Sequence, residues 1–418
     1  VCVIGSGGRE HALAWRLSIS PSVTKVYAIP GSAAMSDCAE LVGIDWQQSN
    51  HLISFLKDNQ VDLVVVGPEA PLVAGLADVL NKAGIPVFGP SKAAAQLEGS
   101  KVFAKDLMKK YNIPTAAYGV FHKVDEAKAF IAQTGAPIVV KADGLAAGKG
   151  VVVAMTIDEA NVAVEDMLSG NRFGDAGSTV VIEEFMEGEE ASLLAFVDGK
   201  TVVPMIASQD HKRIFDGDKG PNTGGMGTYA PAPVLTDALR DAAMKTILEP
   251  MVAAMEKEGM PYVGCLYAGL MITDEGPKVV EFNARFGDPE TQVVLPLLDS
   301  DLGEIMMACA KGTLTSNMVK WKDSSAACVI LASKGYPETS SKGDVISGDI
   351  KQYDTTIVFH SGTKLVGENY VTNGGRVLGV VGLGKDLRTA LDRAYERIEH
   401  IDFEGMQYRT DIGAKAFK

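Results

Sequence analysis

The amino-acid sequence predicts a multidomain protein of mixed α/β and α+β class, with a doubly wound parallel sheet first and a small β-rich domain last. Length is the first reason, because 418 residues exceed the roughly 250–300 residues at which a single hydrophobic core stops growing. The second reason is that residues 1–100 alternate strand and helix patterns, as βαβ units do. The third is that short strands separated by glycine-rich turns begin near Ser324.

The first hundred residues supply the strands and helices of the predicted parallel sheet. The run Val61–Gly67 is almost entirely β-branched, which is typical of a strand buried on both faces. The expected strands are Val1–Ile4, Lys25–Ile29, Val61–Gly67 and Pro86–Gly89, and the expected helices are Glu10–Ser18, His51–Asn59 and Leu72–Ala83.

A second α/β region follows, and the C-terminal region after it is predominantly β. Ser208–Ala232 is rich in glycine and proline with little periodicity, and we predict a long loop there. The expected helices are Ser91–Tyr111 with Ser91 as N-cap, Ile157–Leu168, Ala238–Lys257 and Leu387–Glu399. The expected strands are Ile138–Ala142, Val151–Ala154, Thr179–Phe185, the hairpin Tyr267–Thr273 with Lys278–Asn283, then Cys328–Ala332, Thr356–His360 and Val377–Val381.

Composition narrows the class of partner. The formal net charge is −14 and the pI is about 5.0, which disfavours nucleic acid and anionic membranes as ligands. No apolar run approaches the ~20 residues of a membrane span. Five scattered cysteines without CxxC spacing argue against a disulfide framework and a zinc site. We therefore expect a cytoplasmic protein that binds small molecules.

Two loops follow strands of the predicted parallel sheet. In residues 5–10, Gly7, Gly8 and Arg9 lie where a strand turns into a helix, a place at which backbone N–H groups bind phosphate. The segment is not the dinucleotide-binding motif G-x-G-x-x-G, because Glu10 stands at the position of the third glycine. Glu69 lies in the second loop, residues 67–72, and would accept hydrogen bonds from hydroxyls or an amine. The alternative for the glycine loop is a purely structural turn. The alternative for Glu69 is a carboxylate that interacts favourably with the dipole of the following helix.

The most informative segment is residues 141–151, a strand lysine followed by a glycine- and alanine-rich loop and another strand. A Walker A loop does not fit, because Gly144 and Gly148 are too close together and Gly150 stands where Ser or Thr is needed. Such a loop can instead fold over a triphosphate while Lys141 neutralises charge. A plain glycine hairpin is the alternative, yet an unpaired interior lysine would be costly.

Polar residues on two further strands also suggest nucleotide chemistry. The predicted strand Thr179–Phe185, which contains Glu183 and Glu184, ends in an acidic loop. Such a segment is suited to binding an adenosine, although acidic loops are usually just solvated. In residues 278–290, which begin with the strand Lys278–Asn283, Glu281, Asn283 and Arg285 alternate, and on a strand they would point to the same face. The first two offer the hard oxygen ligands that Mg²⁺ prefers, and an arginine suits a carboxylate or phosphate.

Several motifs in order resemble the ATP-grasp ligases, and among them the family of phosphoribosylamine–glycine ligases (glycinamide ribonucleotide synthetases). They are GSGGREHA (5–12), VGPEAPL (66–72), KADGLAAGKGV (141–151), EEFMEGEE (183–190), QDHKR (209–213), GPNTGGMG (220–227), EFNARFGDPETQ (281–292), GGRVL (374–378) and YRTDIG (408–413). The resemblance covers the whole chain. It implies ADP-forming ligation of glycine to 5-phosphoribosylamine through a glycyl phosphate, in purine biosynthesis.

The resemblance also implies an architecture. It is an N-terminal substrate-binding domain at residues 1–100, an ATP-grasp domain at 101–323 with an inserted lid at about 115–187, and a C-terminal domain at 324–418. A monomer is expected, with ATP as co-substrate and Mg²⁺ or Mn²⁺ at Glu281 and Asn283. The alternatives are another ADP-forming carboxylate–amine ligase of the same superfamily and a non-catalytic nucleotide sensor.

Roles carry over by matching motif positions. The implied nucleotide contacts are Lys105, Lys141, Gly144, Gly148, Lys149, Gly150, Glu183, Glu184, Phe185, Glu190 and Lys212. The implied contacts for phosphoribosylamine are Gly7, Gly8, Arg9, Glu69 and Arg376. Asp210 and Arg285 are the candidates for gripping glycine, and together with Lys212 they form the expected catalytic group.

Overall fold

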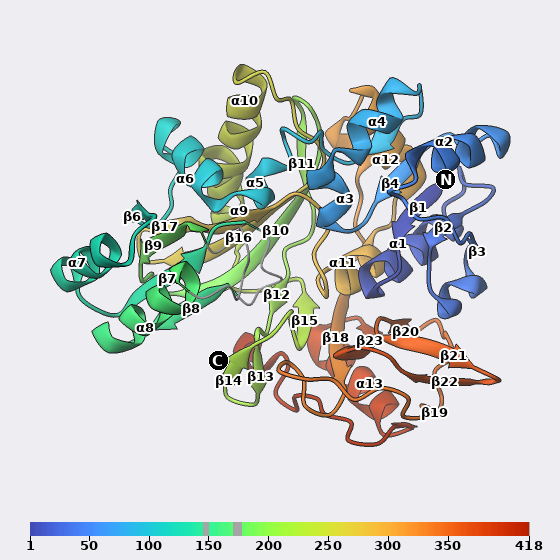
Figure 1. Ribbon diagram of the computed structural model, residues 1–418. Helices are drawn as coiled ribbons and strands as arrows, with labels where there is room; N and C mark the ends of the chain where they lie inside the picture. Colours follow the sequence, from blue (N-terminus) through green and yellow to red (C-terminus); the bar gives the residue numbers. More distant parts are fainter. Residues whose placement is uncertain (145–149, 170–177, 418) are drawn as a thin grey trace.

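The N-terminal region is the predicted doubly wound sheet (Figure 1). The structure, a computed structural model, describes residues 1–144, 150–169 and 178–417. All strand pairs of the first sheet are parallel, in the order β3-β2-β1-β4-β5. Its elements are β1 Cys2–Gly5, α1 Gly8–Ser18, β2 Tyr27–Pro30, η1 Ala33–Asp37, β3 Glu40–Leu41, α2 Ser49–Asp58, β4 Val64–Val66, α3 Glu69–Ala74, α4 Leu76–Lys82 and β5 Val87–Phe88.

Two predicted helices are each broken into two. The helix expected at Leu72–Ala83 is α3 and α4, because Gly75 between them has φ +96°, a left-handed conformation that glycine adopts without steric cost. The helix expected at Ser91–Tyr111 is α5 (Gln96–Gly99) and α6 (Lys101–Lys110). Ser91 Oγ accepts from the amide of Ala94 and caps the turn that precedes α5, whose own N-cap is Ala95. Ser100 Oγ accepts from the amide of Phe103 and caps α6.

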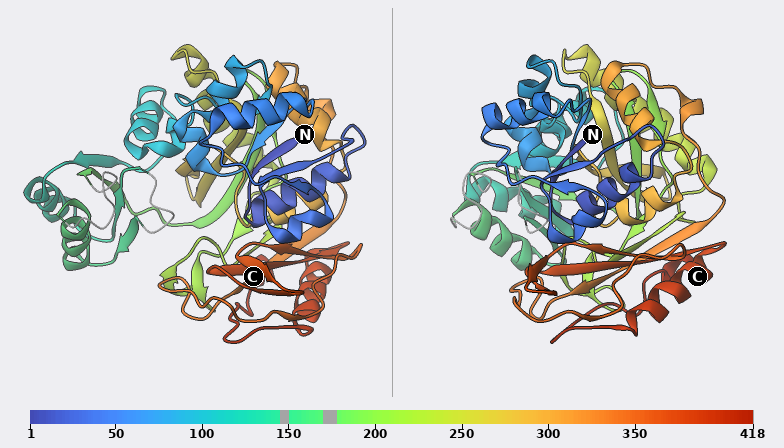
Figure 2. Two further views of the ribbon diagram at one scale, coloured as in Figure 1. Left: turned by 45° about the vertical axis from the view of Figure 1, so that its right-hand side comes forward. Right: turned by 90° about the vertical axis from the view of Figure 1, so that its right-hand side faces the viewer.

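A small antiparallel sheet stands out from the rest of the molecule (Figure 2). Its strand order is β6-β9-β7-β8, and two helices pack on it around an apolar cluster of their own. The elements are β6 Tyr118–Phe121, α7 Val124–Thr134, β7 Ile138–Ala142, β8 Val151–Ala154, α8 Ile157–Leu168 and β9 Val180–Glu184. This unit projects away from the N-terminal and C-terminal regions (Figure 2).

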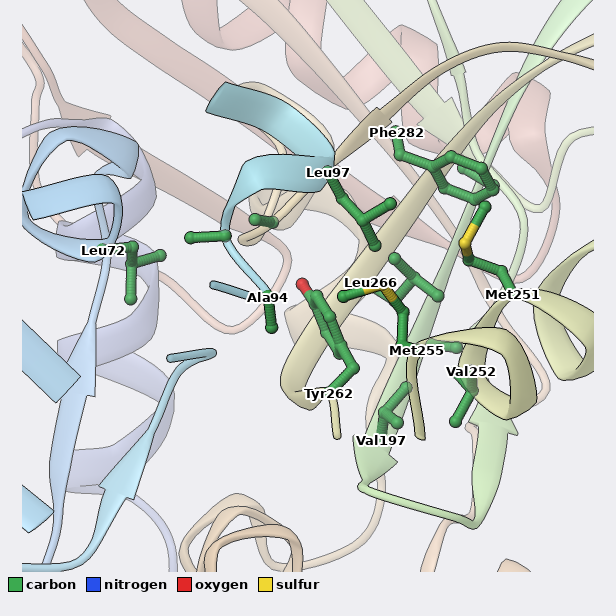
Figure 3. Packing of buried hydrophobic residues seen from close by; sticks show 14 of the residues in the cluster. Leu72, Ala94, Leu97, Val197, Met251, Val252, Met255, Tyr262, Leu266 and Phe282 are labelled. Atoms are coloured by element: carbon green, nitrogen blue, oxygen red, sulfur yellow. The ribbon is translucent and has the colours of Figure 1, made fainter. Parts of the chain in front are cut away.

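The central sheet lies between this small sheet and the N-terminal region (Figure 1). It is antiparallel in the order β11-β10-β16-β17, and the predicted hairpin forms its last two strands. Its elements are β10 Glu189–Asp198, β11 Val202–Pro204, α9 Asp237–Ala243, the π-helical turn Met244–Leu248, α10 Glu249–Lys257, β16 Val263–Thr273, β17 Gly276–Asn283, α11 Thr291–Leu297, α12 Leu302–Lys311 and η4 Ser316–Met318. Figure 3 shows α10 packing through Met251 and Met255 beside Leu266 and Tyr262.

The long loop predicted at Ser208–Ala232 contains strands instead. They are β12 Gln209–Asp210, β13 Arg213–Phe215, β14 Lys219–Asn222 and β15 Gly227–Ala230. β13 and β14 pair with each other, whereas β12 and β15 extend the C-terminal sheet through pairing of β15 with β18. The prediction failed because the partner strand lies about a hundred residues further along the chain.

The C-terminal region is the predicted β-rich unit. Its main sheet has the order β12-β15-β18-β23-β20, and α13 packs on β23 and β18. The elements are β18 Ser325–Ala332, β19 Ser347–Gly348, β20 Thr356–His360, β21 Thr363–Val366, β22 Asn369–Thr372, β23 Arg376–Gly384, α13 Leu387–Ile398, β24 Ile401–Asp402 and η5 Ala414–Phe417. Over the described part of the chain, no helix is long and apolar enough to cross a membrane.

Candidate functional site

Two buried lysines, one on the small antiparallel sheet and one on α6, meet at one carboxylate. Lys141 on β7 and Lys105 on α6 lie 2.9 and 3.1 Å from Glu183 Oε2 on β9. Lys141 also donates to the carbonyl of Val280 at 3.1 Å, which connects the small antiparallel sheet to β17. Burial lowers the pKa of Lys105 to about 8, although the charge of Glu183 opposes the shift. The sequence analysis assigned both lysines to the nucleotide and did not predict that they pair with the Glu183 side chain.

The start of the glycine loop is anchored on the N-terminus of α6. The Asp143 carboxylate accepts from the amides of Lys101 and Val102 at 2.6 and 3.2 Å, and Lys101 Nζ donates to the carbonyl of Gly144 at 2.9 Å. Burial lowers the pKa of Lys101. Lys101 and Asp143 were not predicted, because the expected helix ran from Ser91 to Tyr111 without a break and hid the helix start at Lys101. Gly148 and Lys149 lie outside the described residues, and the Gly150 carbonyl accepts from Ala142.

The segment that was predicted to hold an adenosine lies at the end of β9. The Glu184 amide donates to the carbonyl of Ala117 at 2.9 Å, and β9 is paired on both sides as far as Glu183. Phe185 follows the strand and is half-buried. Beyond it, the exposed Glu190 forms an ion pair with Lys212. Burial would lower the pKa of Lys212, but the charges of Glu190 and Glu281 outweigh it and raise that pKa.

Glu281 and Asn283 alternate at the end of β17, as predicted. Burial raises the pKa of Glu281, but the charges of nearby lysines outweigh it, so the net shift is downward and the carboxylate is ionised; those lysines are Lys212, Lys141 and Lys101. The Asn283 Oδ1 accepts from Arg285 at 3.3 Å. Within the described ranges no three His, Cys, Asp or Glu side chains come together as a metal site. Two hard oxygens beside a cationic cluster fit a divalent ion that takes its remaining ligands from phosphate and water.

Asp210 occupies a buried acidic corner. Its Oδ1 is buried without a hydrogen-bond partner among the described residues. Burial and the charge of Glu290 raise its pKa. Glu290 is itself 3% exposed, and it accepts from Tyr267 Oη at 2.8 Å and Ser192 Oγ at 3.2 Å. A buried acceptor that lacks a donor costs free energy, so this corner is suited to an ammonium donor.

Arg285 lies between two carboxylates. It lies 2.7 Å from Glu98 Oε1 and 3.4 Å from Glu69 Oε2. Burial would lower its pKa, but these carboxylates raise it. Arg9 joins the same group, 3.9 Å from Glu69, with hydrogen bonds to Glu10 and to the carbonyl of Phe286. The sequence predicted Arg9, Glu69 and Arg285, while Glu98 was missed because it lies in an expected helix.

The first glycine loop closes around Glu10. The Gly7 amide donates to Glu10 Oε2 at 2.7 Å, so this N–H already has an acceptor. A side chain at Gly5 or Gly67 would collide with the Glu10 side chain, and one at Gly8 would collide with Ser361. These glycines therefore also have the structural role that was considered as the alternative.

Arg376 joins the C-terminal sheet to this group. Its guanidinium donates to the carbonyls of Gly224 and Asp288 at 2.7 and 2.8 Å and lies 3.4 Å from the Asp288 carboxylate. The Asp288 carboxylate would also lie 3.9 Å from a Cβ at Gly7. Residues from the N-terminal, central and C-terminal regions thus converge on one place.

Comparisons with known proteins agree with this geometry. The family models of phosphoribosylglycinamide synthetase match along the chain: the N domain at residues 1–98, the ATP-grasp (A) domain at 99–291 and the C domain at 326–415. The phosphoribosylamine–glycine ligases of Halalkalibacterium halodurans and Neisseria meningitidis are both 53% identical to this chain. The alignments cover 100% and 99% of it, and 97% and 98% of those proteins.

Solved structures give the same result. The crystal structure of phosphoribosylamine–glycine ligase from Thermotoga maritima matches with a TM-score of 0.86 and 34% identity over 99% of both chains. The biotin carboxylase domain of Hydrogenobacter thermophilus 2-oxoglutarate carboxylase shares the fold, with a TM-score of 0.74, 15% identity, and 97% and 91% of the two chains covered. The chain belongs to the phosphoribosylglycinamide synthetase family.

Proposed function

We propose that the protein joins glycine to 5-phosphoribosylamine at the expense of ATP, giving glycinamide ribonucleotide, ADP and phosphate in purine biosynthesis. The observation that carries this proposal is a cluster of lysines: Lys101, Lys141 and Lys212 interact with Glu281, and Lys105 joins Lys141 at Glu183. Relatives that are 53% identical over the whole chain and are named for this activity support it.

The reaction has two displacements. A glycine carboxylate oxygen attacks the γ-phosphorus of ATP, ADP leaves, and glycyl phosphate forms. The nitrogen of phosphoribosylamine then attacks the glycyl carbonyl carbon. The bond to the phosphate oxygen breaks, phosphate leaves with the electron pair, and the nitrogen releases one proton. Negative charge develops on phosphoryl oxygens in the first step, so fixed cations beside them lower its barrier.

The nucleotide residues divide by their position. Lys105, Lys141 and Lys212 bind the phosphates, under a lid loop that includes Gly144, Gly148, Lys149 and Gly150. Glu183, Glu184 and Phe185 border the adenine, with Phe185 supplying backbone beyond the paired strand. Glu190 binds the ribose. When nucleotide binds, its phosphates compete with Glu183 and Glu190 for the same ammonium groups.

Glu281 and Asn283 would hold Mg²⁺ or Mn²⁺. A divalent ion there would neutralise phosphate charge. Both residues are fixed by β17, and the ionised state of Glu281 is the state that a metal requires. Lys212 and Lys141 keep that carboxylate charged before the ion arrives.

The two other substrates occupy the neighbouring acidic and arginine groups. Asp210 accepts the glycine ammonium, and Arg285 pairs with the glycine carboxylate. Arg376, Arg9, Gly7 and Gly8 bind phosphoribosylamine, and Glu69 accepts from its hydroxyls or amine.

We also propose the following organisation. The domains are residues 1–100, 101–323 and 324–418, with the lid at about 115–187. The protein is a cytoplasmic monomer that binds neither nucleic acid nor membrane.

Phosphate release from ATP tests the function. Release that needs glycine and freshly made phosphoribosylamine together, with ADP as the nucleotide product, supports the ligase. Turnover that does not depend on the sugar amine would indicate another carboxylate–amine ligase. Folded protein that binds ATP without turnover, with Mg²⁺ or Mn²⁺ present, would indicate a nucleotide sensor.

A further inference from the structure

A cavity of about 480 Å³ lies between the N-terminal sheet and the C-terminal region. One wall is the loop after β1 and the segment after β2, and the other is the turn from β20 into β21. In Figure 1, β20 and β21 lie close to the N-terminal region, and β21 contacts η1. The polar side chains that line the cavity are Ser6, Ser32, Ser361, Thr363, Lys364 and Asn373.

The lining has the chemistry of an anion site. Four hydroxyls, one amide and one ammonium face the cavity, and none of the described residues that line it is Asp or Glu. That is unusual surface for a chain with a net charge of −14. Ser32 Oγ is buried and has no hydrogen-bond partner among the described residues. Its hydroxyl is therefore available to donate to a bound anion.

The walls are fixed by backbone and side-chain hydrogen bonds. The Ser361 and Gly362 amides donate to the carbonyls of Val377 and Arg376 at 2.9 and 2.8 Å, and Asn373 donates to the carbonyl of Gly362 at 2.7 Å. On the other side of the turn, His360 Nδ1 lies 3.0 Å from Thr363 Oγ1. A site held in this way needs little reorganisation on binding.

The same turn is docked on the N-terminal region. The amide of His360 donates to His11 Nδ1 on α1 at 3.0 Å. Gly8 packs against Ser361 so closely that a side chain there would collide. The carbonyl of Arg376 accepts the hydrogen bond from the Gly362 amide, and the guanidinium of Arg376 forms an ion pair with Asp288. The cavity therefore adjoins the group of residues to which the sugar amine is assigned.

We propose that this cavity binds the phosphate end of the phosphorylated sugar amine, with Lys364 as the charged contact and Ser32, Ser361 and Thr363 as neutral donors. This inference rests on the proposed function. It assigns the recognition of the phosphate to the junction of the first and last domains, so that the substrate itself bridges them. The protein would then have two separate anion sites, because the nucleotide phosphates are assigned to Lys105, Lys141 and Lys212.

Charge reversal tests the assignment. In Lys364→Glu we expect the KM for phosphoribosylamine to rise at least tenfold, with the KM values for ATP and glycine unchanged, since a lost charged hydrogen bond costs about 1.5–3 kcal/mol and 1.4 kcal/mol is a factor of ten. Lys385→Glu is the matched control, because Lys385 is an exposed lysine of the same domain that does not line the cavity. In Lys364→Arg the KM for phosphoribosylamine should stay close to the wild-type value, because the positive charge is kept.

A stable probe separates the phosphate from the sugar. Ribose 5-phosphate should compete with phosphoribosylamine in the wild type, ribose should not, and Lys364→Glu should weaken that competition as much as it raises KM. Equal KM values and equal inhibition in Lys364→Glu and Lys385→Glu would overturn the inference while leaving the ligase activity intact. Wild-type protein without any turnover of phosphoribosylamine would instead refute the function on which the inference rests.

Discussion

Lys141 Nζ lies 2.9 Å from Glu183 Oε2, and only 6% and 3% of the two side chains are exposed. Lys105 shares the same carboxylate oxygen at 3.1 Å. One buried carboxylate thus holds two ammonium groups at the place assigned to the nucleotide phosphates. Before ATP binds, Glu183 supplies the negative charge that these lysines require.

Removing this carboxylate should destabilise the protein mainly in the absence of nucleotide. We expect Glu183→Gln to lower the free energy of unfolding by about 3 kcal/mol, because it leaves buried charges without a partner. Saturating ATP should restore part of that loss, since the ligand binds the folded state through the same lysines. Urea unfolding with and without ATP measures both. Glu184→Gln, at the exposed end of the same strand, is the control, and equal losses in the two variants would contradict the prediction.

The lowered pKa of Lys105 should make ATP binding sensitive to pH. Burial lowers this pKa to about 8, so the ammonium is present below that value and is lost as the pH rises through it. We expect the KM for ATP to rise from about pH 7 to about pH 9. Lys105→Arg should flatten the profile, because a guanidinium stays charged. Lys109→Arg, on the exposed face of α6, should keep the wild-type profile, and a flat profile in the wild type would refute the assignment.

The parts of the fold that sequence predicted are those in which the local pattern decides the structure. The strand β4 was predicted because it lies in a nearly continuous β-branched run. The hairpin of β16 and β17 was predicted because a turn sequence separates two apolar runs. Strands β12 and β15 were missed because two to four residues give no measurable period. They become strands because β15 pairs with β18, far along the chain.

The site shows the same division. Glu281 and Asn283 could be identified because their alternation on a strand is visible in the sequence. Glu98 could not, since its partner Arg285 lies almost two hundred residues away. The buried pairing of Glu183 was hidden in the same way, because a run of acidic residues has the same appearance whether it is solvated or paired across a sheet.

The glycine pocket makes a prediction about Asp210. Its buried Oδ1 has no partner among the described residues, and an ammonium would satisfy it. We expect Asp210→Asn to raise the KM for glycine more than tenfold with little change in the KM for ATP, because a charged hydrogen bond is lost. Initial rates at varied glycine measure this. Asp241→Asn, an exposed carboxylate on α9, is the control.

Arg285 should affect the same substrate. Arg285→Lys keeps the charge but loses the planar fork that binds a carboxylate, so the KM for glycine should rise while the protein stays folded beside Glu98. Unchanged glycine saturation in both Asp210→Asn and Arg285→Lys would place the glycine elsewhere.

The metal assignment predicts a change in ion dependence. Glu281→Gln should raise the half-saturating concentration of Mg²⁺ for ATP turnover by an order of magnitude or more, because the variant removes the charged one of two protein ligands. Titration of activity with Mg²⁺ and with Mn²⁺ measures it. Glu275→Gln, on the exposed turn of the same hairpin, should leave both titrations unchanged. A Glu281→Gln enzyme with a wild-type titration curve would exclude this residue as a ligand.

Three buried histidines should make the fold sensitive to mild acid. His11, His211 and His360 are 1–3% exposed, and burial lowers their pKa values to about 3, 4 and 4. In the unfolded chain a histidine titrates near pH 6.5. Below that value the unfolded state binds more protons, so stability falls as the pH drops from about 6.5 toward about 4.

A substitution at the domain junction tests this sensitivity. Each such histidine contributes up to about 1.4 kcal/mol per pH unit, and urea unfolding across this range measures the total slope. His11→Gln keeps an acceptor for the amide of His360 but cannot be protonated, so its slope should be shallower than that of the wild type. His51→Gln is the control, because His51 is exposed in the folded protein, and the slope of this variant should equal that of the wild type. A slope that His11→Gln leaves unchanged would mean that the junction opens before His11 is protonated.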